Sequence, residues 1–529
     1  MILNMGCDMK EFNTTGNCVP KLNYMVDVTE KLDKIIRMIK SGDYFTINRP
    51  RQYGKTTTLF TIRRILLEKD DFLPVKISFE GVSDFSFETE KSFCSMILKS
   101  IGSDKDIREK GYSELFHSQI DNVNNLSDFS NIITQIITTI NKKVVLMIDE
   151  VDAGSIFDVF LRFLGLLRDK FLNAREDYDV TFHSVILAGV TDIKTLKSKI
   201  RPDSNAQLVS PWNIAVDFDV NMTFNPKEIG TMLTEYIAAT SMKMDINEIS
   251  ERIFFWTNGY PFLVSKICSI IDEKISPKEQ WKINDVEEAV KILLTQKIPL
   301  FDYMVKYLEN DPELSVFIES LVLGVKEYSF RGRSPLTEKA VFYGLVGCSA
   351  EGKIIIHNKI FEECLTDYYV EKMETSTGTQ IINIPPKSAY LKPDGRLNFE
   401  NILLKFQEAI KANFYNNKLD KSEEFLEADL RMQFMMFLKP LLNGYGHCFK
   451  EVVTGAEKRL DVVVVYRDEK FIVELKIWHG SEAHEEGKQQ LLNYMKLESV
   501  NKGYMLIMSK NKNKEFKHEV EDGITMIWV

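Results

Sequence analysis

The chain has 529 residues and a mass of 61.2 kDa, which at roughly 100–200 residues per domain predicts about three or four domains. Hydrophobic residues make up 44% of the chain and charged residues 27%, which excludes collagenous, mucin-like and wholly disordered proteins. The net charge of −10 excludes a protein that coats nucleic acid with its whole surface, because such a surface is basic. The net charge does not exclude a locally basic groove.

The sequence also lacks the signatures of membrane and secreted proteins. No apolar run approaches the ~18–20 residues that span a bilayer, and residues 1–18 contain no basic region followed by an apolar one. The seven cysteines are scattered without a Cys-x-x-Cys pair, which argues against a zinc site or a disulfide framework. We therefore expect no secretory signal, reduced thiols, a cytoplasmic location and no membrane partner.

Taken in chain order, residues 1–43 predict a lead-in segment with one helix at 28–40. From Tyr44 to about Val220, β-rich runs alternate with helical stretches. Four runs are apolar on both faces, as expected for strands of a parallel sheet covered by helices. These runs are 44–48, 75–79, 144–149 and 183–189.

The remaining residues predict helices, a small mixed module and a separate α/β unit. Residues 226–300 have a helical pattern interrupted by a turn at 258–261, and residues 301–373 predict a winged-helix-like module. The polar, proline-bearing segment 374–397 is the best candidate for a linker. Residues 398–529 then form an α/β unit of their own.

Residues 44–60 have the strand–loop–helix order of a phosphate-binding loop. Gly54, Lys55 and Thr56 match the second half of the pattern G-x-x-x-x-G-K-[ST]. The glycine lets backbone N–H groups approach phosphates, the lysine neutralises the β- and γ-phosphate charge, and the threonine hydroxyl ligates Mg²⁺. The first glycine of the pattern is missing, because Arg49 stands in its place.

A second element supports nucleotide chemistry. The apolar run 144–149 ends in Asp149 and Glu150, where one carboxylate can hold the Mg²⁺ shell and the next can polarise the attacking water. The alternative is that these two residues and Asp152 cap a following helix. The Gly-Lys-Thr upstream favours nucleotide binding, because P-loop NTPases use this order.

The fourth run is followed by Thr191, and a polar strand tip in such an ATPase can sense the γ-phosphate. Polar strand ends are also common without that role. The basic stretch 193–202 leaves three alternatives open: a solvated helix face, a DNA contact or the source of an arginine finger.

Residues 458–478 predict a β-hairpin with a second set of reactive side chains. Asp461 begins its first strand, and alternation puts Glu474 and Lys476 on one face of its second strand. The two carboxylates can hold Mg²⁺ or Mn²⁺ through hard oxygen ligands, while the lysine orients or activates water for phosphodiester hydrolysis. The alternative is a cross-strand salt bridge.

The setting of this hairpin distinguishes it from other Glu-x-Lys spacings at 351–353 and 486–488, neither of which lies on a clear strand. Helices are predicted on both sides. The helix 423–442 can bring Glu427 to the site or present it to solvent. Gln490 and Tyr494 are four residues apart on one helical face, which suits the lining of a substrate groove.

These motifs carry a resemblance to two known families. The first is a resemblance to the AAA-like P-loop ATPases of anaerobic bacteria, and it lies in residues 12–27, 44–57, 147–152, 201–204 and 210–215. The second is a resemblance to the PD-(D/E)XK nuclease-superfamily domain that is fused to these ATPases, and it lies in residues 437–446, 458–466, 471–480 and 490–495. The resemblance covers nearly the whole chain.

The resemblance implies an α/β multidomain fold: an ASCE/AAA-like P-loop NTPase parallel sheet with a helical lid and a winged-helix-like module, plus a C-terminal restriction-endonuclease-like α/β domain. The implied parts are an ATPase domain at 1–225, a helical lid at 226–300, a winged-helix-like module at 301–373, a linker at 374–397 and a nuclease-like domain at 398–529.

Carried over by position, the resemblance also implies the site residues. Those serving ATP and Mg²⁺ are Lys55, Thr56, Asp149 and Glu150. The nucleotide site predicted from the sequence also includes Arg49, Arg51, Gly54, Thr57 and Thr191. Those forming the nuclease centre are Glu427, Asp461, Glu474, Lys476 and Gln490. The family pattern makes Arg49 a normal loop variant, and Leu460 replaces the proline that gives the nuclease superfamily its name.

We therefore predict an ATP-regulated, Mg²⁺-dependent deoxyribonuclease, in which ATP changes domain arrangement or oligomeric state and so licenses cleavage. DNA is the expected partner rather than RNA, self-association through the ATPase domain is expected, and defence against foreign DNA is a consistent setting. Two alternatives stay open. One is a regulatory NTPase switch whose C-terminal domain binds nucleic acid without cutting it, and the other is an ATP-driven DNA translocase or repair motor.

The charge is distributed unevenly along the chain. Residues 401–529 hold 19 Lys+Arg and 20 Asp+Glu, a net of −1, so the remaining −9 belongs to residues 1–400. Five lysines cluster near the C-terminal end, either as solvated surface or as phosphate contacts: Lys502, Lys510, Lys512, Lys514 and Lys517. The total charge therefore leaves room for a local grip on nucleic acid by one domain.

Overall fold

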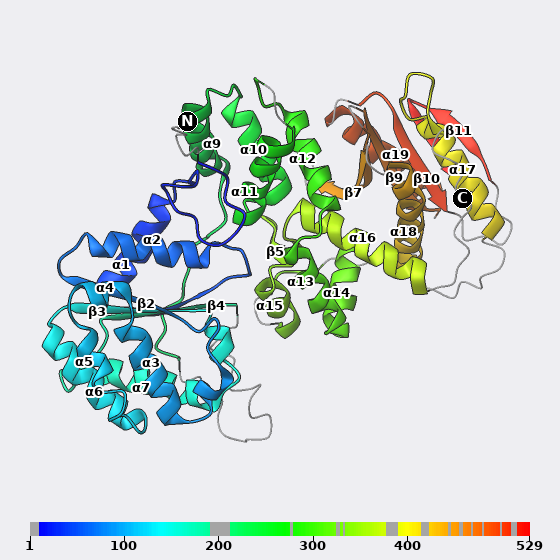
Figure 1. The fold of residues 1–529 in the computed structure, drawn as a ribbon. Coiled ribbons are helices and arrows are strands. Elements are labelled where there is room, and N and C mark those ends of the chain that lie inside the picture. Colours follow the sequence, from blue (N-terminus) through cyan, green and yellow to red (C-terminus); the bar gives the residue numbers. More distant parts are fainter. Residues whose placement is uncertain are drawn as a thin grey trace. The chain divides into compact units, whose positions relative to one another are not determined.

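The computed structural model describes residues 10–190, 212–275, 279–323, 328–331, 334–376, 390–413, 423–442, 446–453, 459–466, 469–478, 481–497, 500–508 and 516–529. The chain divides into two compact units: residues 1–296 with 337–345, and residues 297–336 with 346–529. Figure 1 shows the elements of each unit. No helix in the described ranges combines the length and the apolarity needed to cross a lipid bilayer.

The first unit is built on a four-stranded parallel sheet whose strands are ordered β1-β4-β3-β2. Its strands are β1 (Tyr44–Asn48), β2 (Phe72–Ser78), β3 (Lys143–Asp149) and β4 (Ser184–Gly189). Nearly all of their residues are buried, as expected for strands covered on both faces. The four predicted strands are confirmed, with small shifts of their ends.

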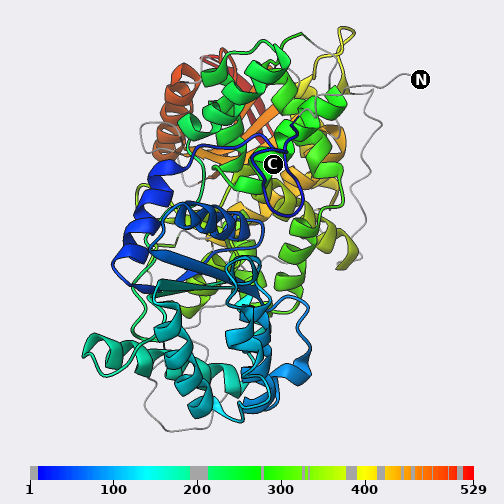
Figure 2. The same ribbon diagram turned by 60° about the vertical axis from the view of Figure 1, so that its left-hand side comes forward.

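Helices cover both faces of this sheet (Figures 1 and 2). One face carries α1 (Thr29–Lys40) and α2 (Lys55–Leu67). The other face carries α3 (Glu90–Gly102), α5 (Ser113–His117), α6 (Leu126–Ile140) and α7 (Asp158–Arg175). The short helix α4 (Lys105–Glu109) contacts α2, because its Asp106 accepts a hydrogen bond from Arg63 Nε at 2.6 Å. The predicted helix at 28–40 is confirmed as α1.

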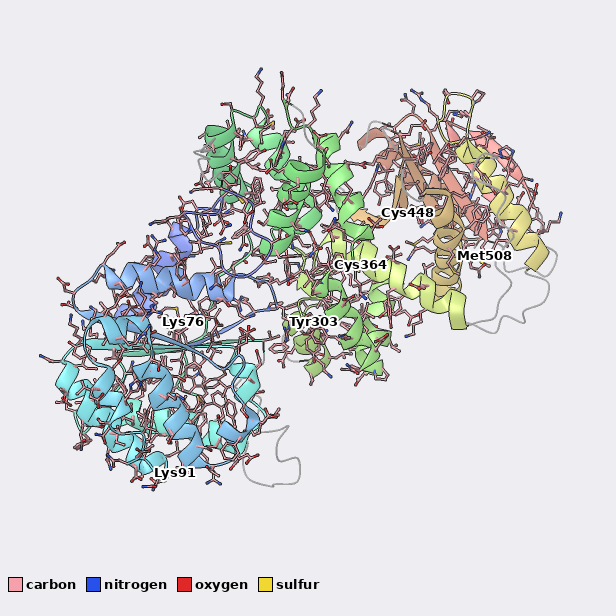
Figure 3. All side chains as sticks on the ribbon, in the orientation of Figure 1. Lys76, Lys91, Tyr303, Cys364, Cys448 and Met508 are labelled. Carbon is pink, nitrogen blue, oxygen red and sulfur yellow. The ribbon has the colours of Figure 1, made fainter. Side chains whose placement is uncertain are left out.

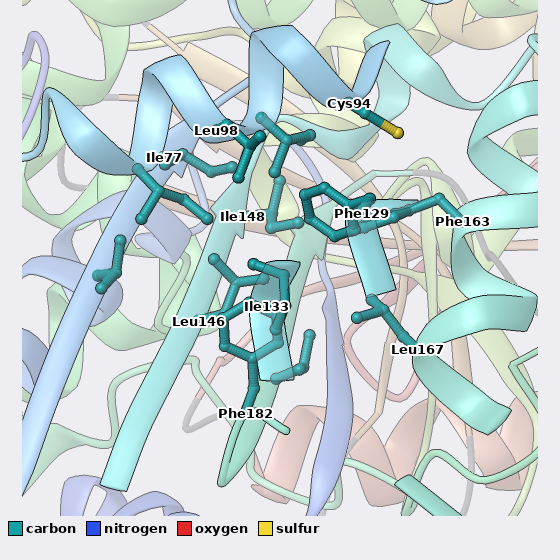
Figure 4. Close-up of a cluster of buried hydrophobic side chains, with 14 of the residues drawn as sticks. Ile77, Cys94, Leu98, Phe129, Ile133, Leu146, Ile148, Phe163, Leu167 and Phe182 are labelled. Atoms are coloured by element: carbon teal, nitrogen blue, oxygen red, sulfur yellow. The ribbon is translucent and has the colours of Figure 1, made fainter. Parts of the chain in front are cut away.

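A large hydrophobic core of this unit lies between the sheet and the helices α3, α6 and α7. Leu146 and Ile148 of β3 point to the same face because strand side chains alternate. Figure 4 shows them beside Ile133 and Phe129 of α6 and Phe163 of α7, all of them buried. Burying each such side chain contributes about 1.5–3 kcal/mol, so this packing fixes the carboxyl end of β3, where the polar residues follow.

Four helices then confirm the helical pattern of residues 226–300. They are α9 (Pro226–Thr240), α10 (Ile246–Thr257), α11 (Pro261–Ile270) and α12 (Ile283–Thr295). Helix α9 starts where the sequence chemistry favours it: Asn225 and Glu228 exchange side-chain-to-backbone hydrogen bonds, and Pro226 occupies the first turn. The N-terminal segment packs on these helices through Phe12, whose ring centroid lies 5.0 Å from that of Tyr236.

The second unit opens with helices and a small antiparallel hairpin over residues 297–376. Its elements are α13 (Pro299–Glu309), α14 (Pro312–Leu323), β5 (Val346–Cys348), β6 (Ile354–Ile356) and α16 (Lys359–Ser376). Helix α15 (Pro335–Phe342) and the residues up to Leu345 belong mostly to the first unit. The winged-helix-like interpretation of this region stays a prediction.

A six-stranded mixed sheet, ordered β11-β12-β10-β9-β8-β7, forms the rest of the second unit. Its strands are β7 (Gly446–Val453), β8 (Arg459–Tyr466), β9 (Glu469–Ile477), β10 (Gly503–Met508), β11 (His518–Glu521) and β12 (Ile524–Trp528). Its helices are α17 (Phe399–Asn413), α18 (Glu423–Leu442) and α19 (Ser481–Leu497). The predicted hairpin is confirmed, because β8 and β9 pair antiparallel with Val462 opposite Val473.

The two faces of this sheet differ in chemistry. Val473 and Leu475 of β9 are buried in a core shared with α17 and α18. The opposite face lies under α19, where a Cβ on Gly487 would be 3.3 Å from Lys476 Cε. Tyr390, inside the segment predicted as a linker, already belongs to the core with α17, whereas 377–389 of that segment lie outside the described residues.

The turn between α10 and α11 depends on a glycine. Gly259 has a φ of +69°, and a Cβ at this position would lie 1.9 Å from the backbone oxygen of Phe224. We expect Gly259→Ala to lower the free energy of unfolding by about 2–4 kcal/mol, since it adds left-handed strain and a backbone clash.

Thermal unfolding followed by circular dichroism measures this loss. Gly111→Ala is the matched control, because Gly111 also has a positive φ of +77° but its Cβ would meet no atom within 4 Å. It should cost only about 1–2 kcal/mol. Equal losses in the two variants would contradict the role assigned to the contact with Phe224.

Candidate functional site

The loop between β1 and α2 is a preformed cradle closed by its own lysine. Gly54 has a φ of +81° and precedes the first residue of α2. The Lys55 side chain is buried, and its Nζ donates to the backbone oxygens of Arg49 and Pro50, at 2.9 Å in each case. The ammonium therefore lies inside the loop, where it can exchange carbonyl oxygens for phosphate oxygens.

The carboxyl end of β3 brings two acidic residues to this lysine. Asp149 is only 2% exposed, and its Oδ2 lies 3.0 Å from Nζ of Lys76 on the neighbouring strand β2 (Lys76 is labelled in Figure 3). Glu150 donates its backbone N–H to Asp149 Oδ1 at 3.1 Å and has a φ of +52°, which is uncommon for a residue with a side chain. Such strain is typical of functional positions.

The alternative of helix capping is not favoured by the geometry. Glu150 precedes the short 3-10 helix Val151–Gly154, yet in this described part of the chain its side chain makes no capping hydrogen bond. Asp152 accepts a hydrogen bond from the backbone N–H of Val190 at 2.6 Å, which ties the end of β4 to the loop after β3. Asp152 therefore positions the loop that carries the two acidic residues.

The charges at this site influence one another. Burial lowers the pKa of Lys55, and the carboxylates of Glu150, Asp152 and Asp149 oppose that change. Burial also raises the pKa of Glu150, while the Lys55 ammonium opposes the rise. The structure therefore brings together Lys55, Asp149 and Glu150 in one partly desolvated cluster.

The other predicted nucleotide residues have different surroundings. The Arg49 guanidinium donates to the backbone oxygens of Phe218 and Val220, at 3.3 and 2.9 Å, and its carbon lies 5.1 Å from the Phe218 ring centroid. Arg51 is exposed on the loop, and Thr56 is half-buried in the first turn of α2. Thr57 Oγ1 accepts from the backbone N–H of Cys18 at 3.2 Å. Thr191 and the basic stretch 193–202 lie outside the described residues.

Sequence reasoning missed two contacts that hold the loop. Tyr260, at the start of α11, donates its hydroxyl to the backbone oxygen of Arg51, and its ring packs edge-on against Tyr53 at 4.8 Å. A Cβ on Gly344 would lie 2.7 Å from Pro50 Cγ. The turn at 258–261 was visible in the sequence, but its partner in the loop was not.

The hairpin of the second unit places a buried acid beside a lysine. Glu474 is 1% exposed, and its Oε1 lies 2.9 Å from Lys476 Nζ, whose side chain is 31% exposed. Because Val462 pairs with Val473, Asp461 and Glu474 are the next residues along the two strands. The observed ion pair lies within β9, whereas the cross-strand alternative involves the Asp461 side chain, which lies outside the part of the structure that is described.

The flanking helices supply the remaining predicted residues. Glu427 lies in α18, and its side chain, like that of Asp461, is outside what the structure describes. Gln490 Nε2 on α19 donates to the hydroxyl of buried Tyr494 at 3.3 Å. The second Glu-x-Lys spacing, at 486–488, serves a different contact, because Lys488 Nζ lies 2.9 Å from both Glu521 and Asp522.

The donor set at the hairpin fits a hard divalent cation. Carboxylate oxygens are the ligands that Mg²⁺ and Mn²⁺ prefer, and the buried carboxylate of Glu474 provides that chemistry. Within the described ranges, no group of three or more His, Cys, Asp or Glu side chains is arranged to hold a metal ion.

Comparison with known proteins follows the same division of the chain. Residues 24–326 match the family model described as an AAA-like domain, and residues 447–519 match that of the PD-(D/E)XK nuclease superfamily. No curated protein matches the chain.

Solved structures are matched at low sequence identity. The Walker-type ATPase paby2304 of Pyrococcus abyssi is 13% identical with a TM-score of 0.47, over 67% of this chain and 99% of that one. The ORC2 protein of Aeropyrum pernix, in its ADPNP–ADP complexes, is 12% identical with a TM-score of 0.42, over 69% and 99%. The RuvB Holliday junction branch migration motor of Thermotoga maritima is 13% identical with a TM-score of 0.33, over 65% and 96%.

The contacts of Arg49 predict a role in holding the loop. We expect Arg49→Met to lower the free energy of unfolding by about 2–4 kcal/mol, since buried backbone oxygens lose charged hydrogen-bond donors. Chemical denaturation measures the change. Arg64→Met, at an exposed position of α2, is the control and should stay within about 0.5 kcal/mol of the wild type. A similarly small effect at Arg49 would argue against this role.

Proposed function

For this chain, which belongs to the AAA-like domain family and carries a C-terminal domain of the PD-(D/E)XK nuclease superfamily, we propose the function of an ATP-regulated, divalent-metal-dependent deoxyribonuclease. The observation that carries the proposal is the Glu474–Lys476 pair, 2.9 Å apart on a strand next to that of Asp461. A buried carboxylate with a half-exposed ammonium beside it is suited to metal-assisted phosphodiester hydrolysis, because it offers a metal ligand and a positive charge for the phosphate.

In this proposal each residue of the hairpin has one task. Asp461 and Glu474 hold the divalent cation, which when bound stabilises the negative charge that develops on the phosphate. Lys476 pairs with Glu474, adds a second positive group near the phosphate and orients the attacking water. Gln490, fixed by Tyr494, lines the substrate groove from α19.

The ATP site works through the loop and the end of β3. Lys55 and the backbone around Gly54 bind the phosphates, and Thr56 with Asp149 holds Mg²⁺. Glu150 accepts the proton of the attacking water. Burial raises the pKa of this carboxyl, which makes it a stronger base than an ordinary glutamate.

Regulation by ATP is supported by the contacts that clasp the loop. Tyr260 holds the carbonyl of Arg51, and Gly344 packs on Pro50. The chain passes directly from Leu345 of the first unit to Val346 of the second. A change in the loop on ATP binding can therefore reach the second unit through covalent connection, and a nuclease restrained in this way would suit defence against foreign DNA.

Removing either member of the hairpin pair should slow cleavage strongly. We expect Glu474→Ala and Lys476→Ala to cut DNA roughly 10²–10³-fold more slowly, because each removes charge stabilisation at the phosphate. The assay incubates plasmid and single-stranded DNA with Mg²⁺ or Mn²⁺, with and without ATP, and follows the products on gels.

Glu486→Ala is the matched control, because this exposed glutamate belongs to the other Glu-x-Lys spacing on α19. It should cut like the wild type. The nuclease proposal is lost if the wild type cuts nothing under any condition, or if the Glu474→Ala variant cuts equally well. DNA-stimulated ATP hydrolysis with processive degradation would favour a translocase instead.

Substitutions at the ATP site should separate binding from hydrolysis. We expect Lys55→Ala to lose ATP binding and the response of cleavage to ATP, and Glu150→Gln to bind ATP but release phosphate roughly 10²–10⁴-fold more slowly. Because only the ionised base accepts a proton, the wild-type rate should fall as the pH is lowered through the raised pKa of Glu150.

Phosphate release across a pH series measures this, with nucleotide binding followed separately. The residual rate of Glu150→Gln should lack the acidic limb, whereas Glu80→Gln, exposed on the loop after β2, should keep the wild-type profile. An acidic limb that persists unchanged in Glu150→Gln would assign the base to another residue.

A further inference from the structure

Three aromatic side chains meet at one end of the nuclease-like sheet. Trp478 follows β9, His484 lies in the first turns of α19, and Trp528 ends β12. Their ring centroids are 4.7 Å apart for Trp478 and Trp528, 5.4 Å for Trp478 and His484, and 5.8 Å for His484 and Trp528. We call this group the aromatic platform.

The platform lies in line with the proposed cleavage residues. Side chains alternate along a strand, so Glu474, Lys476 and Trp478 follow one another on the same face, about 6.6 Å apart at each step. Trp478 stays in register because its backbone N–H donates to the Met508 oxygen at 2.8 Å. Ile507 of β10 pairs with Lys476 on one side and with Trp528 on the other, which puts both tryptophans close to the lysine.

The aromatic platform differs from a hydrophobic core in its exposure and in its hydrogen bonding. All three side chains keep part of their surface exposed, unlike Phe471 and Phe399, which stack at 4.4 Å on the opposite, buried face. Within the described residues, Trp528 Nε1 and His484 Nδ1 have no hydrogen-bond partner. Indole N–H groups in finished cores are normally paired.

We propose that the aromatic platform binds an unpaired base of the nucleic-acid substrate while Lys476 faces the adjoining phosphate. This inference rests on the proposed nuclease function, because the place of the platform beside Lys476 is what identifies its ligand. Bases stack on aromatic rings whatever their sequence. Bases inside a duplex already stack on each other, so the platform selects single strands, flaps or frayed ends.

Binding without cleavage tests the platform. The full chain is titrated into fluorescein-labelled oligothymidylate in the presence of EDTA, and anisotropy gives the dissociation constant. We expect Trp478→Leu to weaken binding roughly fivefold to a hundredfold, since one stacked base contributes ~1–3 kcal/mol. Trp478→Phe retains a ring and should keep most of the affinity.

A duplex of the same length is the matched probe, and it should bind more weakly than the single strand and lose little affinity in Trp478→Leu. Equal affinities of the Leu and Phe variants for the single strand, or equal wild-type affinities for single strand and duplex, would overturn the platform. Melting curves show whether each variant is folded. If Trp478→Leu does not fold, Trp528→Leu and the quenching of tryptophan emission by oligothymidylate, compared with Trp478→Phe, decide in the same way.

The two proposals fail separately in these experiments. If the platform proposal is wrong, Mg²⁺-dependent cleavage is still slowed by Glu474→Ala, but the affinity for single strands is the same in Trp478→Leu and Trp478→Phe. If the nuclease proposal is wrong, the wild type cuts DNA under no condition. Binding of single strands in EDTA that depends on the ring at position 478 would then still support the platform.

Discussion

The burial of charge is the constraint on which both candidate sites depend. Lys55 and Asp149 are 5% and 2% exposed, and removing a charged group from water is costly unless hydrogen bonds and opposite charges compensate. Lys55 is compensated by two carbonyl oxygens of its own loop, and Asp149 by the ammonium of Lys76. The Lys55 ammonium and the Asp149 carboxylate are therefore each held by a defined partner, the loop carbonyls for one and Lys76 for the other.

The second unit also buries a charged side chain, that of Glu474. Glu474 is nearly inaccessible, and the ammonium of Lys476 is its compensating charge on the same face of β9. The helix α19 approaches this face closely, because Gly487 leaves room for the Lys476 stem. The ion pair holds the Glu474 carboxylate in place and leaves the Lys476 side chain 31% exposed.

Much of this arrangement could be predicted from the sequence, because periodicity reports which face of an element is buried. The apolar runs gave the parallel strands, and the alternation of Glu474 and Lys476 in an apolar strand gave their common face. Lys76, Tyr260 and Trp528 could not be found in this way. Each acts on a residue more than fifty positions distant or on another strand, and pattern along one element carries no information about its tertiary partner. Arg49 occupies the loop as predicted, yet its guanidinium contacts carbonyl oxygens that only the fold brings near.

The contacts around the loop carry a physical consequence for coupling. Lys55 donates to the carbonyls of Arg49 and Pro50, Tyr260 to that of Arg51, and Pro50 also meets Gly344. Under the proposed function, a phosphate that attracts the Lys55 ammonium competes with the carbonyls of Arg49 and Pro50, next to the Arg51 carbonyl that Tyr260 holds. Because packed elements have few alternative arrangements, coupling through this loop would act by shifts of whole elements. In the proposed function this loop is the part that responds to ATP, and the chain enters the second unit at Val346, directly after Leu345.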